Sequence, residues 1–493
     1  MRKNKFDQSI ALVIFGITGD LSRRKLMPAI YQLQKESHLT QKINIIGFAR
    51  RPWSNSELIE NLRNGVEEFA RIKPADDQLM TDLFKNAIYI QSQFGEKAGY
   101  ERLNSLIEKA AFDGIVFYLA TPPGEYLEII TLLGELIKKP KRGWLRLVVE
   151  KPYGSDLNSA IELENTLHRF FKEEQIYRID HYLGKETVQN ILVFRFANGI
   201  FEPIWNNHYI DHVQIIVAEK AGIGTRAGYF ENTGVIRDMF ANHLLQLLTL
   251  TAMEAPFAIN ADSVRDEKMK VLRSLKPIAG KLGIENTIRG QYSSGKIDNN
   301  NVIAYKQEKG VSQSSTTETY IAVKTHIDNW RWAGVPFYIR SGKCLPKRAT
   351  EIAIHFKQIP LSLFEWRNMA GIAPNVLVLR LQPDEGISLT FGAKQPGYQN
   401  EIAPVNMEFC YKDAFGVNPP EAYERLLLDC FSGDATLFTR SDEVLAQWAF
   451  TQGILDSWKR YPVSKLPTYP AGTWGPAEAD NFLQKDDRNW RNP

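Results

Sequence analysis

The stretch Ile10-Ala-Leu-Val-Ile-Phe15 is a continuous apolar run of strand length, and it leads directly into the turn Gly16-Ile-Thr-Gly19-Asp20-Leu21-Ser22. An apolar run bounded by glycine in this way predicts a buried parallel strand. From Asp20 the apolar residues recur at helical spacing, and a second apolar strand follows at residues 43–48. The segment therefore predicts a strand, helix, strand unit with a glycine turn at its first corner.

The same alternation of patterns continues to about residue 150. It predicts a doubly wound, Rossmann-like parallel sheet, which is an α/β fold. The expected helices lie at 57–69, 100–110 and 126–137, and the expected strands at 87–90, 114–120 and 145–149.

Beyond about residue 180 the rhythm changes to strand candidates of period two with few helices between them. This predicts a second, larger α+β domain with a mainly antiparallel sheet and helices on one face. The polar segment 293–301 is predicted to be a loop. The strand candidates lie at 209–217, 319–324, 337–340, 351–356, 376–381 and 387–391.

Composition excludes several classes of protein. The 493 residues carry 60 basic and 57 acidic side chains without a clustered basic stripe, so no nucleic-acid partner is expected. The three cysteines show no metal-ligand spacing, which favours a reducing compartment and no metal site. No apolar run approaches the roughly 18 residues of a membrane helix, so we expect a cytoplasmic protein without a membrane partner.

The glycine turn after the first strand is a candidate cofactor site. Glycines there let backbone N–H groups approach a pyrophosphate at a helix N-terminus. Gly16 and Gly19 give Gly-x-x-Gly-x-x-Ser rather than Gly-x-Gly-x-x-Gly, so an ordinary turn stays open as the alternative. The second strand ends at Arg50 with no acid nearby, which favours the 2′-phosphate of NADP, although a solvated charge is the simpler alternative.

Two segments carry polar groups at the expected carboxyl edge of the sheet. Lys151 follows a strand in Glu-Lys-Pro-Tyr-Gly, where it can reach a sugar hydroxyl and the nicotinamide together. The segment Arg178-Ile-Asp180-His181-Tyr182-Leu-Gly-Lys185-Glu leads into a predicted helix at 187–194. On that helix His181 and Lys185 would share one face and suit a phosphate dianion, while a polar helix cap with Asp180 is the alternative.

His243 stands in a largely apolar helical segment, so the sequence predicts a buried structural histidine and a catalytic one equally well. Oxidation of a hydroxyl-bearing carbon needs a base near neutral pH, and imidazole supplies one. Lys343 ends a predicted strand at a glycine, where it is either a surface lysine or a further phosphate contact.

Taken together, these segments resemble the glucose-6-phosphate dehydrogenase family over nearly the whole chain. The most specific match is the nine-residue segment that begins at Arg178, and Ile-Arg-Asp with His243, Arg-Ser-Gly-Lys343 and Glu424-Arg425-Leu426 follow in the same order. One departure is Ser155, which stands where many members have arginine.

The resemblance implies a role for each candidate residue. His243 is expected to be the general base, and Asp180 the carboxylate that orients it, so Asp180 fits better as the partner of His243 than as a helix cap. The phosphate of the substrate is expected at His181, Tyr182, Lys185 and Lys343, and the sugar hydroxyls at Lys151, Glu219 and Asp238. The candidate cofactor residues are Gly16, Thr18, Gly19, Asp20, Leu21, Lys25, Arg50 and Lys151.

The resemblance further implies NADP-dependent oxidation of glucose 6-phosphate to 6-phosphogluconolactone, the first step of the oxidative pentose phosphate pathway, by a homodimer or a dimer of dimers. We expect an NADP-binding domain at 1–180 and a substrate-binding and oligomerisation domain at 181–493. Two alternatives remain: an oxidoreductase acting on an unphosphorylated sugar, which the pair His181 and Lys185 argues against, and a catalytically silent NADP-binding regulator.

Overall fold

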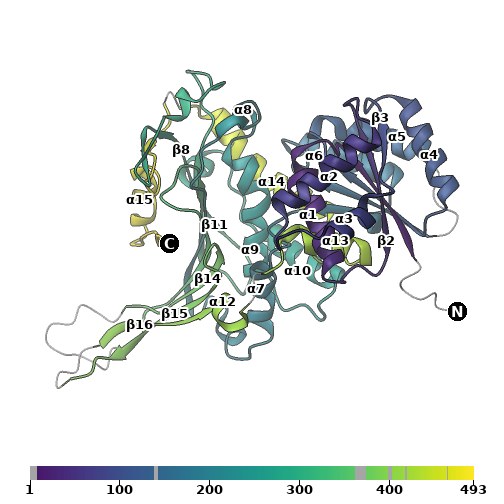
Figure 1. The fold of residues 1–493 in the computed structure, drawn as a ribbon. Helices are drawn as coiled ribbons and strands as arrows, with labels where there is room; N and C mark the ends of the chain where they lie inside the picture. The colour runs from purple at the N-terminus through teal and green to yellow at the C-terminus, as the bar shows by residue number, and fades with distance from the viewer. Residues whose placement is uncertain (1–7, 138–142, 361–372, 398–401, 417–418, 464) are drawn as a thin grey trace. The chain divides into compact units, whose positions relative to one another are not determined.

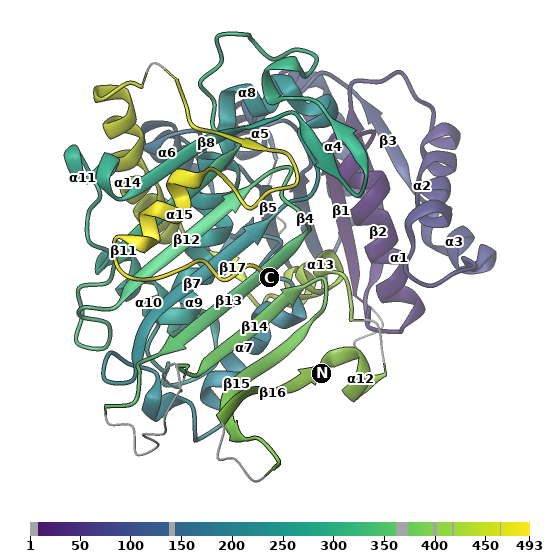
Figure 2. The same ribbon diagram turned by 90° about the vertical axis from the view of Figure 1, so that its left-hand side faces the viewer.

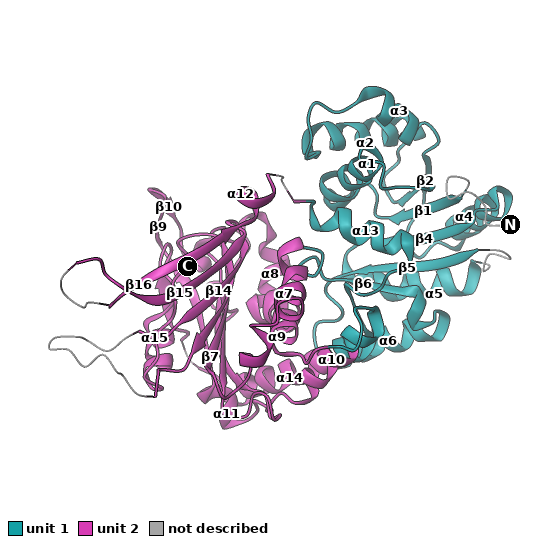
Figure 3. Cartoon of the chain, turned by 90° about the horizontal axis from the view of Figure 1, so that it is seen from below, with its two compact units in different colours: residues 1–185, 256–265, 420–445 teal, residues 186–255, 266–419, 446–493 magenta. Residues whose placement is uncertain are grey.

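The computed structural model describes residues 8–137, 143–360, 373–397, 402–416, 419–463 and 465–493 (Figure 1). The chain forms two compact units, which Figure 3 distinguishes by colour. Unit 1 consists of residues 1–185, 256–265 and 420–445, and unit 2 of residues 186–255, 266–419 and 446–493. Unit 1 therefore takes in two segments that lie far along the chain from its first 185 residues.

Unit 1 is built on a seven-stranded sheet whose order is β17-β6-β5-β4-β1-β2-β3. Six strands run parallel, and only the short β17 is antiparallel to its neighbour β6. This is the predicted Rossmann-like architecture. The strands are β1 (Ser9–Phe15), β2 (Lys42–Ala49), β3 (Ile88–Gln91), β4 (Gly114–Leu119), β5 (Trp144–Glu150), β6 (Ile176–Ile179) and β17 (Phe438–Thr439).

The helices of unit 1 agree with the predicted pattern, with small shifts at their ends. The sequence did not predict the short helix α3, the helix α6 that follows β5, or α13, which comes from the distant segment 420–445. The helices are α1 (Met27–Lys35), α2 (Asn55–Phe69), α3 (Asp77–Phe84), α4 (Lys97–Ala110), α5 (Tyr126–Leu136), α6 (Leu157–Phe170) and α13 (Ala422–Ser432).

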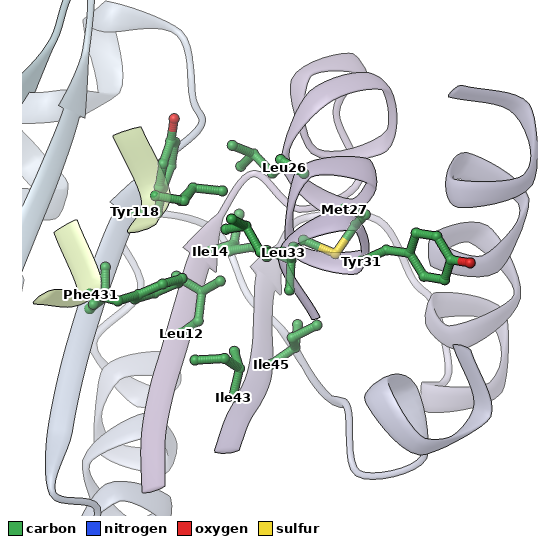
Figure 4. Close-up of a cluster of buried hydrophobic side chains, with 14 of the residues drawn as sticks. Leu12, Ile14, Leu26, Met27, Tyr31, Leu33, Ile43, Ile45, Tyr118 and Phe431 are labelled. Carbon is green, nitrogen blue, oxygen red and sulfur yellow. The ribbon is translucent and has the colours of Figure 1, made fainter. Parts of the chain in front are cut away.

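The core of unit 1 explains why β1 reads as an uninterrupted apolar run. Leu12 and Ile14 of β1 are fully buried and contribute to one hydrophobic cluster with residues of α1 and β2 (Figure 4). Phe431 of α13 belongs to the same cluster. Burial of this apolar surface joins the distant segment 420–445 to the parallel sheet.

Unit 2 is built on a nine-stranded sheet of order β16-β15-β14-β13-β7-β12-β11-β8-β18 (Figure 2). It is mostly antiparallel, as predicted, with β7 and β12 forming a parallel pair near its middle. The strands are β7 (Ile210–Ala218), β8 (Thr287–Ser293), β11 (Tyr320–His326), β12 (Pro336–Gly342), β13 (Ala349–Phe356), β14 (Val376–Gln382), β15 (Gly386–Lys394), β16 (Ile402–Cys410) and β18 (Thr468–Pro470).

Helices line one face of this sheet, where Figure 1 shows α7 and α9. Two helices, α10 and α14, begin in unit 1 and end in unit 2. None of the helices in the described part of the chain has the length and apolar character of a bilayer span. The helices are α7 (Glu186–Phe196), α8 (Ala227–Val235), the π-helix η7 (Ile236–Leu244), α9 (Leu245–Ala252), α10 (Ala261–Arg273), α11 (Lys281–Glu285), α12 (Tyr411–Phe415), α14 (Ser441–Arg460) and α15 (Ala477–Gln484).

One local prediction is wrong: residues 293–301 are not simply a loop. They contain β9 (Gly295–Ile297) and the start of β10 (Asn300–Val302), which pair as a small hairpin. The turn residues Asp298 and Asn299 have φ angles of 45° and 66°. Aspartate and asparagine tolerate this left-handed conformation, which a two-residue hairpin turn requires, so polar composition alone gave the wrong prediction.

The last residues of the chain are held on unit 2 by polar contacts. Arg488 donates to both carboxylate oxygens of Asp211 at 2.9 Å, and the Gln214 side chain donates to the Asn489 carbonyl at 2.9 Å. Beside these contacts the rings of His212 and His355 stack, with centroids 4.1 Å apart. A histidine pair therefore lies next to the strand residues that anchor the C-terminal tail.

This pair predicts a loss of stability in acid. Burial, reinforced by the neighbouring His212, lowers the pKa of His355 to about 3. The folded state thus keeps His355 neutral, whereas the unfolded chain protonates it below about pH 6.5. The free energy of unfolding therefore keeps its full value, as far as His355 is concerned, above that pH, and it decreases as the pH falls toward 3. At pH 5 the loss should be about 2 kcal/mol of unfolding free energy.

The measurement is the unfolding free energy of the wild type and of His355→Gln at pH 7.5 and pH 5. The variant should lose less stability between the two pH values than the wild type. His208→Gln, at an exposed position of unit 2, is the matched control. Equal losses in the wild type and His355→Gln would show that His355 is not the titrating group.

Candidate active site

The glycine turn after β1 lies where the parallel sheet changes its winding direction, because β1 pairs with β2 on one side and with β4 on the other. In such sheets ligands bind outside the carboxyl ends of the strands at this point. Gly16 has a φ of 81°, and a Cβ there would lie 2.4 Å from the Ala120 carbonyl oxygen. Only glycine permits so close an approach of the two strand ends, which favours a cofactor turn over an ordinary one.

The other predicted residues of the turn lie on the same short segment. Thr18 and Gly19 are half-buried, Asp20 is exposed, and Leu21 packs partly against the hydrophobic core. The Gly19 amide donates to the Gly16 carbonyl at 2.8 Å, which closes the turn.

Two of the three cations predicted for the cofactor site, Lys25 and Arg50, have a carboxylate partner within unit 1. Lys25, in the π-helical turn after the glycine segment, lies 2.6 Å from Glu421. Arg50, directly after β2, has its guanidinium 3.7 Å from Glu125 and over the ring of Phe94 at 5.5 Å from the centroid. The Arg50 guanidinium therefore lies at the end of β2, the position predicted for the 2′-phosphate of NADP.

Lys151 follows β5 at the same edge of the sheet, and its peptide bond to Pro152 is cis. The preceding Glu150 is buried and accepts hydrogen bonds from the hydroxyls of Tyr118 at 2.6 Å and Tyr423 at 3.1 Å. Burial raises the pKa of Glu150 to about 7, against the lowering effect of these bonds. A carboxyl group that titrates near neutral pH thus stands beside Lys151.

Asp180 lies next to Lys151 along the sheet edge, because the parallel pairing of β5 and β6 ends with Glu150 opposite Ile179. Asp180 is 2% exposed, and one of its carboxylate oxygens accepts the Tyr182 amide at 2.9 Å. Its side chain is therefore fixed by the turn that follows β6. Arg178, one residue before the end of β6, pairs with Glu164 and Glu173.

His181, Tyr182 and Lys185 follow as a series of turns, and here the sequence prediction is wrong. The helix begins at Glu186, so His181 and Lys185 do not share a helical face. The amides of Leu183 and Lys185 instead donate to the carbonyls of Asp180 and Tyr182, which forms two overlapping tight turns.

The second turn packs closely at Gly184, since a Cβ there would lie 2.7 Å from the Ala422 carbonyl oxygen. The turns still bring polar groups together. The Lys185 ammonium lies over the Tyr182 ring at 4.1 Å from its centroid, and the His181 ring makes an edge contact with Tyr182. His181 and Lys185 are half-buried, whereas Tyr182 is buried.

In unit 2 the structure brings together three residues that the sequence placed far apart. Glu219 and Lys343 follow β7 and β12, whose parallel pairing ends with Ala218 opposite Gly342. The buried Lys343 ammonium lies 2.5 Å from Glu219 and 3.9 Å from Asp238. Two carboxylates around one buried ammonium form a polar cluster that suits a ligand with several hydroxyl groups.

His243 lies on the same helix as Asp238, five residues further on, and is fully buried. This segment is a π-helix, in which hydrogen bonds join residues i and i+5, so Asp238 and His243 lie on one side of it. π-helical turns are rare and occur frequently at functional sites. Asp238 therefore connects the helix that carries His243 to the Lys343 cluster within unit 2.

Sequence reasoning missed several residues at the edge of the unit 1 sheet. Glu150 belongs to the Glu-Lys-Pro motif, but nothing in the sequence indicated its two tyrosine partners. Tyr423 and Glu421 come from the segment 420–445, whose return to unit 1 is a tertiary contact. The family match at Glu424-Arg425-Leu426 through Arg440-Ser441-Asp442-Glu443 was the signal in the sequence that this segment matters.

Comparisons with known proteins show the family of the chain. Residues 13–190 match the model of the glucose-6-phosphate dehydrogenase NAD binding domain, and residues 192–491 match the C-terminal domain of the same family. The chain is 46% identical to glucose-6-phosphate 1-dehydrogenase of Aggregatibacter actinomycetemcomitans, covering 99% of this chain and 98% of that protein. It is 41% identical to the Bacillus subtilis (strain 168) enzyme over the full length of both.

Solved structures give the same result. A glucose-6-phosphate dehydrogenase in complex with its substrate glucose-6-phosphate aligns with a TM-score of 0.87 and 36% identity over both whole chains. Glucose-6-phosphate 1-dehydrogenase from Mycobacterium avium aligns with a TM-score of 0.83 and 33% identity, over 98% of this chain and 99% of that one. The predicted fold class and NADP-linked oxidation of glucose 6-phosphate are thereby confirmed. Because both family models match the chain and its relatives are similar to it over nearly their whole length, the chain belongs to the glucose-6-phosphate dehydrogenase family.

Proposed function

We propose that this enzyme oxidises glucose 6-phosphate at C1 with His243 as the general base. The observation that carries this assignment is the buried cluster of unit 2, in which His243 follows Asp238 by one π-helical turn and Asp238 shares Lys343 with Glu219. Imidazole is the side chain whose ordinary pKa lies nearest neutrality, so it can accept the hydroxyl proton at physiological pH.

The remaining residues of the proposed site act on the substrate around C1. Asp180, a residue of unit 1, is assigned to orient His243 and stabilise its protonated form, as the family resemblance implies. Lys151, Glu219 and Asp238 are assigned to the sugar hydroxyls, because carboxylates accept and an ammonium donates hydrogen bonds. The phosphate is assigned to His181, Tyr182, Lys185 and Lys343, three of which carry or can carry positive charge.

Residues of unit 1 fit a bound NADP. Gly16 has no Cβ, so a pyrophosphate can approach the backbone of the turn closely. Arg50 offers a guanidinium for the 2′-phosphate. Lys25, Lys151 and the turn residues Thr18, Gly19, Asp20 and Leu21 complete the proposed cofactor site. When bound, NADP supplies the hydride acceptor. Arg50 should give NADP a higher kcat/KM than NAD.

We also propose the domain roles, the oligomeric state and the cellular compartment that the sequence predicts. Residues 1–180 bind NADP, and residues 181–493 bind the substrate and form the homodimer or dimer of dimers. The edge strand β16 supports assembly through this domain, because its Val405 and Met407 are 37% and 62% exposed. The free thiols of Cys344, Cys410 and Cys430 support a cytoplasmic location.

The test is NADPH or NADH formation with glucose 6-phosphate, galactose 6-phosphate and glucose, using each cofactor in turn. We expect glucose 6-phosphate with NADP to give the highest kcat/KM and glucose to give at most a trace, because glucose leaves the phosphate-binding cations without a partner. Comparable efficiency with glucose would contradict the assignment of His181, Lys185 and Lys343. Equal efficiency with NAD would contradict that of Arg50.

A further inference from the structure

Arg50 and Glu125 form an ion pair at the cofactor edge of unit 1. Arg50 is the first residue after β2, and Glu125 ends the short 3-10 helix that follows β4. The guanidinium and carboxylate lie 3.7 Å apart, and their side chains are 55% and 28% exposed. The chain therefore places a negative charge beside the arginine that the proposed function assigns to the 2′-phosphate.

The position of this pair identifies the part of the cofactor that it meets. β1 lies between β2 and β4, so the pair spans the carboxyl end of β1, where the Gly16 turn begins. In Rossmann-like sheets the pyrophosphate lies at that turn, and the adenosine ribose lies toward the end of the second strand. Arg50 and Glu125 therefore flank the ribose end of the cofactor site.

The two side chains favour different cofactors. An arginine at this corner accommodates the 2′-phosphate of NADP, whereas a carboxylate accepts hydrogen bonds from the ribose hydroxyls of NAD. No acid follows β2, where NAD enzymes usually have one, but Glu125 brings a carboxylate to the same corner from the other side of β1. The negative charge of Glu125 also acts on a neighbouring side chain. The pKa of Tyr100 is raised mainly by burial, and further by the charges of Glu128 and Glu125.

We propose that Glu125 is a specificity-determining residue that weakens the preference for NADP over NAD. Its carboxylate competes with the 2′-phosphate for Arg50 and repels the phosphate charge, while it tolerates a free 2′-hydroxyl. This inference rests on the proposed role of Arg50.

The expected effect of removing the charge is moderate, because exposed ion pairs contribute little and salt screens them. Glu125→Gln should lower KM for NADP and raise kcat/KM for NADP about three- to fivefold, with no comparable gain for NAD. The ratio of the two efficiencies should therefore rise. The gain should shrink in roughly 1 M salt, where the Debye length falls to about 3 Å.

The experiment compares both cofactors in the wild type, Glu125→Gln, Arg50→Gln and the double variant. Glu135→Gln is the matched control, because it removes the same charge from an exposed position near the end of α5. A higher NADP to NAD ratio in Glu125→Gln, absent from Glu135→Gln and abolished in the Arg50→Gln background, would support the inference.

Other outcomes separate the two claims. If Arg50→Gln lowers the NADP preference but Glu125→Gln leaves it unchanged or lowers it as well, the role of Arg50 stands and the inference about Glu125 is wrong. A lowered preference in Glu125→Gln would mean that Glu125 serves only to position Arg50. If Arg50→Gln leaves the ratio unchanged, the proposed role of Arg50 fails and the inference fails with it.

Discussion

Replacing His243 by asparagine is expected to lower kcat by about 100- to 10,000-fold, the typical contribution of a general base. Asparagine keeps a polar side chain of similar size but cannot accept a proton near neutral pH. Because His243 is fully buried, the change removes basicity at one defined position of the π-helix. The measurement is steady-state NADPH formation at saturating glucose 6-phosphate and NADP.

A loss of activity must be separated from a loss of folding. His208→Asn makes the same substitution at an exposed position of unit 2 and should keep wild-type activity. The His243→Asn variant should still bind NADP and should keep a cooperative unfolding transition. The fall in kcat/KM toward acid pH that protonation of the base causes should be absent from the variant. Turnover near that of the wild type, or a loss no larger than the loss of folded protein, would refute the catalytic assignment.

The sequence predicted the fold of unit 1 well because its strands are buried on both faces and read as uninterrupted apolar runs, as in Ile10–Phe15. It failed where local patterns compete with tertiary packing. The turns at 181–185 look like the start of a helix, but the contact between Gly184 and Ala422 is invisible in the sequence. The hairpin around Asp298 was missed because its strands are only three residues long.

The candidate site shows the same limit. Periodicity alone left His243 undecided, and its chemical role came from the need for a base near neutral pH and from the family resemblance. The convergence of Glu219, Asp238 and Lys343 depends on the parallel pairing of β7 and β12, and no rule of spacing could supply that pairing. Residues that surround the site from distant segments, such as Tyr423, carry no local signal at all.

The ion-pair network beneath Asp180 predicts the largest effect on stability. Arg178 is fully buried in β6, and its guanidinium donates to both oxygens of Glu164 at 2.8 and 2.6 Å and to those of Glu173 at 2.8 and 3.0 Å. Burial pulls the pKa of Arg178 down, but the charges of Glu164 and Glu173 outweigh it and hold that pKa above its ordinary value. The arginine therefore pairs with two carboxylates at the base of the segment that carries Asp180.

Arg178→Met should lower the free energy of unfolding by about 3–5 kcal/mol, because the buried carboxylate of Glu164 loses both of its hydrogen bonds to the guanidinium. Loss of the pair should also displace the turn two residues further on and reduce kcat, since Asp180 directly follows the end of β6. Chemical denaturation and kcat of the folded variant are the measurements. Arg169→Met, on an exposed position of α6, should change stability by no more than about 0.5 kcal/mol.

A double variant distinguishes an uncompensated charge from a simple loss of packing. If the unpaired carboxylate causes the instability, adding Glu164→Gln to Arg178→Met should recover part of the lost free energy, because the neutral amide costs less to bury than the charge. A double variant less stable than Arg178→Met would mean that the arginine acts mainly by filling space. A loss below about 1 kcal/mol in Arg178→Met would mean that the network does not hold β6 in place, and that Asp180 is fixed by its own turn to Tyr182.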